Sequence, residues 1–138
     1  MRKIKFKGKR VGSVEWVYGA YMAHDYDGHT IFNQNLEDGT LQGFEVIPDT
    51  VGQFTGLKDK NGVEIYEGDI ITTDLERPYL IVEYRNGAFM LNCNDGLDDY
   101  YDIFFGTTEE PQEVYKYGEV IGNITDNPEL MEVTEEEN

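Results

Sequence analysis

The sequence contains one cysteine, Cys93, and one serine, Ser13, among its 138 residues. A single cysteine excludes an intrachain disulfide and favours a reducing, cytoplasmic setting. The sequence also has no glycine-rich phosphate loop, no serine-hydrolase motif and no apolar run as long as about ten residues. These absences argue against P-loop enzymes, Rossmann enzymes, serine hydrolases, a membrane span and a secretion signal.

Basic residues are scarce except at the start of the chain. Lys and Arg total 11 against 28 Asp and Glu, which gives a formal net charge of −17. Six basic residues and no acidic residue lie within residues 1–10, so the rest of the chain carries a net charge of −23. Such a body should repel nucleic acid and anionic membranes, and it should attract basic proteins or divalent cations.

Short alternating segments and frequent turns predict a mainly-β protein. Phe, Tyr and Trp make up 13% of the residues, and there are 15 glycines. Aromatic residues favour strands, and glycine favours the turns between them. Predicted strands lie at residues 3–7, 14–21, 44–47, 63–66, 79–84, 89–93 and 117–124, and two more begin at residues 30 and 70.

The segment 53–71 has the densest turn chemistry in the chain. The Asn-Gly pair at 61–62 favours a positive φ, because glycine has no Cβ and asparagine tolerates the left-handed region. The Glu-Gly-Asp corner at 67–69 leads into the strand that begins at Ile70. Two bends this close together are typical of a small, strongly bent β-barrel.

Two clusters of polar side chains resemble functional sites, but their spacing is poor. His24 and His29 are not at the i, i+4 spacing of a zinc-binding helix, and Asp27 with the following glycine predicts a plain hairpin turn. The acidic residues at 95–102 are interpreted as a solvated loop, and no glycine has the ligand spacing of an EF-hand. We therefore expect no catalytic, cofactor-binding or metal-binding residues. Cys93 is expected to pack as a small apolar side chain.

The first strand and the tryptophan each have two interpretations. Ile4 and Phe6 alternate with lysines, which predicts a half-buried edge strand protected by lysine. The alternative is a basic arm that binds nucleic acid. Trp16 is the only tryptophan, and it is interpreted as a strand anchor in or beside the core, the alternative being a platform on which a ligand stacks.

The end of the chain predicts one more strand and a short helix. The strand at 117–124 contains Gly122, which indicates a bulge or a close approach of the backbone. Asn127 can cap a helix whose first residue is Pro128, and Glu129 suits its positive end. An acidic tail follows.

Several segments together resemble one family. Residues 46–71, VIPDTVGQFTGLKDKNGVEIYEGDII, resemble the central signature of the YopX family, whose members are carried by bacteriophages and prophages of mainly Gram-positive bacteria. Other segments resemble further parts of the family, in the expected order. Residues 4–10 resemble its opening, and residues 15–19 resemble its W-x-Y-G element. Residues 119–124 and 127–130 resemble its ending.

The resemblance implies a fold but no activity. It implies a mainly-β chain, with an SH3-like barrel in its C-terminal part, and it carries no catalytic or binding residues. Within a single YopX-like chain, 1–138, we expect a β-hairpin portion at 1–50, the barrel at 51–126, and a short helix with an acidic tail at 127–138.

The expected function is therefore that of a phage or prophage accessory protein in the cytoplasm of a bacterial host. We expect it not to be an enzyme, to need no cofactor and to bind a phage or host protein. The alternative is a role related to nucleic acid, either as a DNA mimic through the acidic surface or as a DNA-binding protein through the basic N-terminus. No membrane partner is expected.

Overall fold

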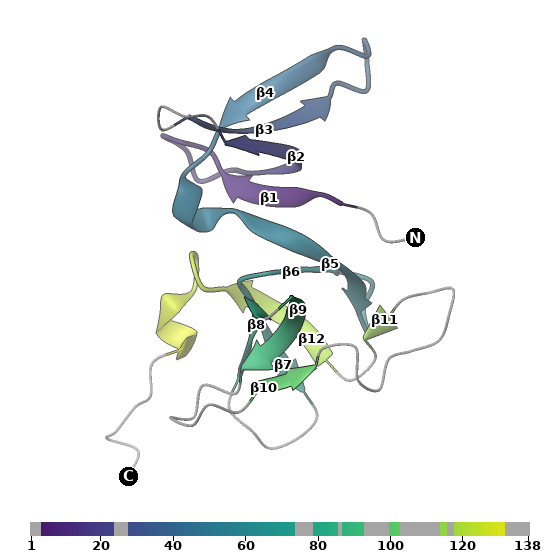
Figure 1. Ribbon diagram of the computed structural model, residues 1–138, viewed down its shortest axis with the longest axis vertical. Helices are drawn as coiled ribbons and strands as arrows, with labels where there is room; N and C mark the ends of the chain where they lie inside the picture. Colours follow the sequence, from purple (N-terminus) through teal and green to yellow (C-terminus); the bar gives the residue numbers. More distant parts are fainter. Residues whose placement is uncertain are drawn as a thin grey trace. The chain divides into compact units, whose positions relative to one another are not determined.

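The alternating segments form β-strands throughout the computed structural model (Figure 1). The structure describes residues 4–23, 28–73, 79–85, 87–92, 100–102, 114–115 and 118–131. The chain divides into two compact units, an N-terminal unit Met1–Phe54 and a C-terminal unit Thr55–Asn138. The mainly-β fold that the sequence predicts is confirmed.

Five strands form the antiparallel sheet of the N-terminal unit, in the order β5-β1-β2-β3-β4. Their bounds are β1 Phe6–Lys9, β2 Trp16–Ala23, β3 His29–Gln34, β4 Leu41–Glu45 and β5 Gly52–Asp59, the last of which continues into the C-terminal unit. A 3-10 turn, η1 Pro48–Thr50, connects β4 to β5.

The sheet of the N-terminal unit curls back on itself at one end. An isolated bridge joins Arg10, just after β1, to Val46, just after β4. The N–H of Ile47 also donates to the carbonyl of Lys9 at 2.9 Å. The curl encloses a small core of Val17, Ile31 and Val46, with partly buried apolar residues around it.

The prediction that the first strand is an edge strand is wrong. β1 pairs with β2 on one side and with β5 on the other, so it lies inside the sheet. Its faces also differ from the prediction, because Ile4 is 74% exposed while the Lys7 side chain is buried. Alternation shows which residues share a face, but it does not show which face is covered or which distant strand pairs alongside.

The C-terminal unit contains a second antiparallel sheet, in the order β10-β9-β8-β7-β12. Its strands are β7 Asp69–Thr73, β8 Leu80–Arg85, β9 Ala88–Asn92, β10 Tyr100–Asp102 and β12 Gly118–Asn123. The continuation of β5 pairs with β6 Glu64–Tyr66 and, in parallel, with β11 Val114–Tyr115.

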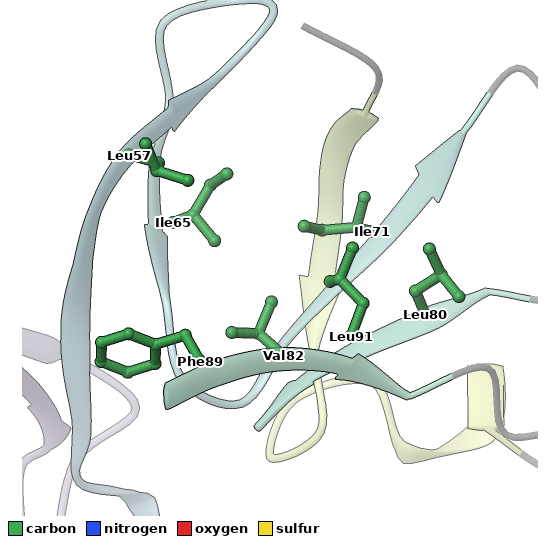
Figure 2. Packing of buried hydrophobic residues seen from close by; sticks show 7 residues of the cluster. All are labelled: Leu57, Ile65, Ile71, Leu80, Val82, Phe89 and Leu91. Carbon is green, nitrogen blue, oxygen red and sulfur yellow. The ribbon is translucent and has the colours of Figure 1, made fainter. Parts of the chain in front are cut away.

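Seven buried apolar side chains form the core of the C-terminal unit (Figure 2). They converge on one interior and come from five strands: Leu57, Ile65, Ile71, Leu80, Val82, Phe89 and Leu91. Burying an aliphatic or aromatic side chain of this size contributes about 1.5–3 kcal/mol each. This cluster is the larger of the two cores.

Several predictions for this unit are confirmed. β5 ends at the turn that holds Gly62, which has a φ of 87°, and the corner at Gly68 has a φ of 93°. The predicted strands at 79–84 and 89–93 correspond to β8 and β9, which form a hairpin around Gly87, and the alternating residues Phe89 and Leu91 are both buried in it. Gly122 lies at a register shift between β12 and β7, which confirms the predicted bulge.

Other predictions are corrected or not confirmed. The last three residues of the expected acidic loop, 100–102, form β10 and pair with β9, while residues 93–99, with Cys93, and the expected acidic tail at 134–138 lie outside the described residues. Among the described strands, β10 and β12 end the sheet without pairing with each other, so a closed SH3-like barrel is not confirmed. In place of the expected helix the structure has a 3-10 turn, η2 Pro128–Met131.

Candidate functional site

The carboxylate of Asp59 is fully buried and accepts three hydrogen bonds from the backbone. Its Oδ1 accepts from the N–H groups of Asn61 at 2.8 Å and Val63 at 2.9 Å, which closes the turn after β5. Its Oδ2 accepts from the N–H of Val120 on β12 at 2.8 Å. Burying a carboxylate lowers the stability of the fold unless hydrogen-bond donors such as these surround it. Here the same hydrogen bonds join the turn after β5 to β12, a strand far along the chain.

Two more buried polar side chains of the 53–71 segment also bond to the backbone. The hydroxyl of Thr55 donates to the carbonyl of Ile65 at 2.8 Å and accepts from the N–H of Leu57 at 3.1 Å. Oδ2 of Asp69 accepts from the N–H of Tyr66 at 2.7 Å, across the corner at Gly68. These contacts agree with the interpretation that the segment carries corner residues.

The structure also describes one of the two histidines of the 24–29 cluster. His29 Nδ1 and the Tyr21 hydroxyl oxygen are joined by a hydrogen bond of 2.6 Å, and the two rings stack at 5.9 Å. His24 and the next three residues lie outside the described part of the chain. Within the described part, no three His, Cys, Asp or Glu side chains gather as metal ligands, and no buried side-chain polar atom lacks a hydrogen bond.

The basic residues of the first strand lie over aromatic rings. The Nζ atoms of Lys7 and Lys9 are 4.7 and 5.9 Å from the centre of the Trp16 ring. Lys5 Nζ is 5.3 Å from the centre of the Phe54 ring. An ammonium group over an aromatic face is attracted by the ring quadrupole, while the alkyl stem packs on apolar surface. Residues 5–9 are therefore part of the sheet and not a separate arm.

Arg10 extends this pattern on the opposite face of the strand. Its guanidinium carbon is 4.9 Å from the centre of the Phe44 ring. The same side chain forms an ion pair with Glu15, with an Nη1 to Oε1 distance of 2.8 Å. Trp16 itself is half-buried, as a strand anchor should be.

The outer face of β2, β3 and β4 carries exposed apolar side chains. The strand registers place alternate residues of these strands on the face opposite the Val17 core, and we call this the β2–β4 face. Tyr18 is 47% exposed, Met22 is 50% exposed and Leu41 is 72% exposed. The ring of Phe32 lies over Gly43, where an added Cβ would be only 2.7 Å from Phe32 Cε1.

Sequence reasoning missed this face. The alternation of 14–21 was visible, but both sets of alternating residues are apolar, so the sequence alone does not identify the exposed set. The signal in the sequence that could have identified this face is the set of aromatic and methionine side chains at even positions from Trp16 to Met22.

Comparisons with known proteins identify the family. The family model described as YopX protein matches residues 5–132. The chain belongs to the YopX family. This YopX chain is also similar to the crystal structure of protein EF1440 from Enterococcus faecalis, with 25% sequence identity and a TM-score of 0.58, over 96% of this chain and 100% of that one. No curated protein matches it.

The two units of the YopX chain differ strongly in charge. Residues 1–54 contain six basic and seven acidic residues, a net charge of −1. Residues 55–138 contain five basic and 21 acidic residues, a net charge of −16. The acidic character of the protein thus belongs to the C-terminal unit, and the exposed β2–β4 face belongs to the unit that is nearly neutral. Among the described residues, no helix has the length and apolar character of a membrane span.

Proposed function

We propose that this YopX-family protein is a non-enzymatic interaction module of a bacteriophage or prophage. In this proposal it acts in the cytoplasm of the bacterial host and binds a phage or host protein through the β2–β4 face. The observation that carries the proposal is the exposure of Tyr18, Met22 and Leu41 on one face of one sheet. The buried Thr55, Asp59 and Asp69 support the same view, because their side chains bond to the backbone.

The chemistry of the β2–β4 face suits a protein partner. Tyrosine and methionine are enriched at protein interfaces, where charged residues are depleted from the centre. Along the part of the face formed by β2 and β3, the exposed and half-buried residues are uncharged: Tyr18, Ala20, Met22, Thr30 and Phe32. Burying these groups costs little desolvation free energy, and the net charge of −1 of this unit reduces long-range repulsion.

The test compares binding by three proteins. Immobilised wild-type protein is exposed to host lysate, and each captured protein is purified and titrated against the wild type, Tyr18→Ser/Met22→Ser, and the control Leu36→Ser/Val63→Ser. The control residues are exposed apolar residues outside the β2–β4 face, at 94% and 47% exposure. We expect the face variant to raise the Kd at least about tenfold, since hot-spot truncations each cost more than about 1 kcal/mol, and the control to change it little. Equal affinities of the two variants would contradict the proposal.

A role related to nucleic acid is the second candidate, and the charge distribution favours its DNA-mimic form. The negative charge is concentrated in residues 55–138, which have a net charge of −16. A concentrated negative charge is attracted to the basic groove of a DNA-binding protein more strongly than the same charge spread evenly over the chain would be. The test is competition between this protein and duplex DNA for a basic DNA-binding protein, at low and moderate salt. Failure to displace DNA at low salt would exclude mimicry of that groove.

Direct binding through the basic N-terminus has less support. Lys5, Lys7 and Lys9 already contact aromatic rings, and Lys7 is buried. We expect no retarded DNA band in a gel shift at low salt. A retarded band that Lys5→Gln/Lys9→Gln abolishes would restore this alternative.

The SH3-like barrel remains part of the proposal for residues 51–126. The meander from β7 to β10 supports it, as does the return of β12 to pair with β7 at a bulge. An experimental structure tests it directly, and pairing that closes the sheet between its ends would establish the barrel.

A further inference from the structure

A row of lysines borders the β2–β4 face on its β1 side. The strand register pairs Lys7 with Tyr18 and Lys9 with Trp16. Directly paired residues of an antiparallel sheet project on the same side, so both lysines lie on the side that carries Tyr18. Lys5 precedes Lys7 by two residues and shares that side. The basic row therefore continues directly into the exposed side chains of β2.

The described strands place little negative charge on this face. β2 has no charged residue, and the one titratable residue of β3 is His29. His29 pairs with Ala23, the neighbour of Met22, and so lies on the opposite side of the sheet. Glu45 of β4 lies on the face, because it pairs with Thr30. The face is thus basic along β1, uncharged along β2 and β3, and acidic at one residue of β4.

Contacts with aromatic rings hold the charge of the lysines at this border. The Nζ atoms of Lys7 and Lys9 lie 4.7 and 5.9 Å from the centre of the Trp16 ring. The ring attracts the charge of an ammonium group, which also carries N–H donors for an oxygen acceptor. Lys7 is buried, whereas Lys5 and Lys9 are half-buried. An acidic group that arrives beside Tyr18 therefore meets the charge of Lys5 and Lys9.

An acidic segment of a protein suits this border better than nucleic acid does. Ammonium groups already lie against the Trp16 ring, and they compete with the stacking of a base on it. The net charge of −17 also repels a nucleic acid, which is charged at every phosphate, more than it repels a segment with a few carboxylates. Charges farther away than about 8 Å are largely screened at physiological ionic strength, so nearby lysines dominate the contact with a short segment.

We propose that the β2–β4 face, together with Lys5 and Lys9, binds an acidic segment of a protein in which Asp or Glu flanks aromatic or aliphatic side chains. The apolar side chains of the segment pack on Tyr18 and Met22, and its carboxylates bind the ammonium groups of Lys5 and Lys9. This inference rests on the proposed function, because it names the chemistry of the partner that the same face binds.

The experiment uses peptides selected on the immobilised full chain from a displayed random-sequence library. We expect the selected peptides to be enriched in Asp and Glu beside aromatic or aliphatic residues. One such peptide is titrated against the wild type, Lys5→Gln/Lys9→Gln, and the control Lys58→Gln/Lys60→Gln. The control makes the same change of charge at two exposed lysines of the C-terminal unit. We expect the Kd to rise at least about tenfold in the first variant and little in the control.

A peptide whose acidic residues are replaced by Asn and Gln tests the same contact without altering the protein. It should bind the wild type about tenfold more weakly than the acidic peptide, and Lys5→Gln/Lys9→Gln should weaken it no further. Selected peptides with no acidic enrichment, or a neutral peptide that binds as tightly as the acidic one, would overturn the inference. Binding of single-stranded DNA that Lys5→Gln/Lys9→Gln abolishes would overturn it too.

The same selection separates this inference from the proposed function. If the selected peptides lose affinity for Tyr18→Ser/Met22→Ser but bind Lys5→Gln/Lys9→Gln as tightly as the wild type, only the acidic chemistry of the partner is wrong. If no selected peptide loses affinity for Tyr18→Ser/Met22→Ser, the β2–β4 face is not the binding surface and both proposals fail.

Discussion

The Asp59 carboxylate accepts a hydrogen bond from the N–H of Val120, 61 positions later in the chain, at 2.8 Å. The same carboxylate holds the turn after β5 through Asn61 and Val63. One buried side chain thus joins the signature segment of the family to the last strand of the C-terminal unit. Removing its charge or shape should affect folding and leave the surface of the N-terminal unit unchanged.

Asp59→Asn should destabilise the protein. The amide group of asparagine would point an N–H toward at least one of the backbone donors, which leaves that donor unsatisfied in a buried site. We expect the free energy of unfolding to fall by about 2–4 kcal/mol, as the loss of hydrogen bonds to a buried charged group predicts. Urea denaturation followed by circular dichroism measures this. Asp49→Asn, at an exposed residue of η1, is the control, and equal losses in the two variants would show that the Asp59 contacts contribute nothing.

Gly8→Ala should also destabilise the protein, for a steric reason. An added methyl group would lie 3.0 Å from Ile31 Cδ1 and 3.1 Å from Val46 Cβ, inside the core of the N-terminal unit. We expect a cost of about 1–3 kcal/mol, which is typical of overpacking. Gly62→Asn is the matched control, because Gly62 has open space around it and asparagine tolerates its φ of 87°. Thermal melts of both variants should separate them, and similar melting temperatures would argue against tight packing at Gly8.

Asp38 gives a prediction for pH. The backbone N–H of Thr40 and then the Thr40 hydroxyl bond to this carboxylate and lower the pKa of Asp38 from its ordinary 3.8. A pKa that is lower in the folded state stabilises the protein above the unfolded value, and this contribution is lost as the pH falls through the folded value. Thr40→Val removes the hydroxyl and should raise the pKa of Asp38 toward 3.8. An NMR titration of the carboxyl carbon measures it, and Thr40→Ser should keep the pKa low.

Glu15→Gln should have a small effect, in contrast to Asp59→Asn. The Arg10–Glu15 ion pair is short, at 2.8 Å, but its side chains are 41% and 62% exposed. Exposed ion pairs contribute about 0–1 kcal/mol because water screens them. We expect the free energy of unfolding to fall by less than about 1 kcal/mol, and by still less at high salt. A larger fall in the free energy of unfolding that persists at high salt would mean that this ion pair stabilises the fold more than an exposed pair can.

The local structure was readable from the sequence because it depends on neighbouring residues. Asn61 with Gly62 and the corner at Gly68 predicted bends where the backbone takes a positive φ, and these bends are present. The alternation around Phe89 and Leu91 predicted a strand, and β9 is present there with both residues buried.

The pairing of distant segments was decided by the tertiary structure. Nothing near Lys7 in the sequence shows that β5 lies on the far side of β1, or that the Trp16 ring lies close to its ammonium. Residues 100–102, two tyrosines and an aspartate, did not look like a strand, yet β9 supplies them with backbone partners.

The sequence by itself determined where the chain bends and which residues alternate, because φ preferences and side-chain alternation act within a few residues. Only the tertiary structure decided which alternating face is covered, which strands pair side by side, and that Asp59 meets Val120. Those outcomes depend on hydrogen bonds and apolar burial between residues far apart in the chain, and local patterns carry no information about which distant strand is the partner.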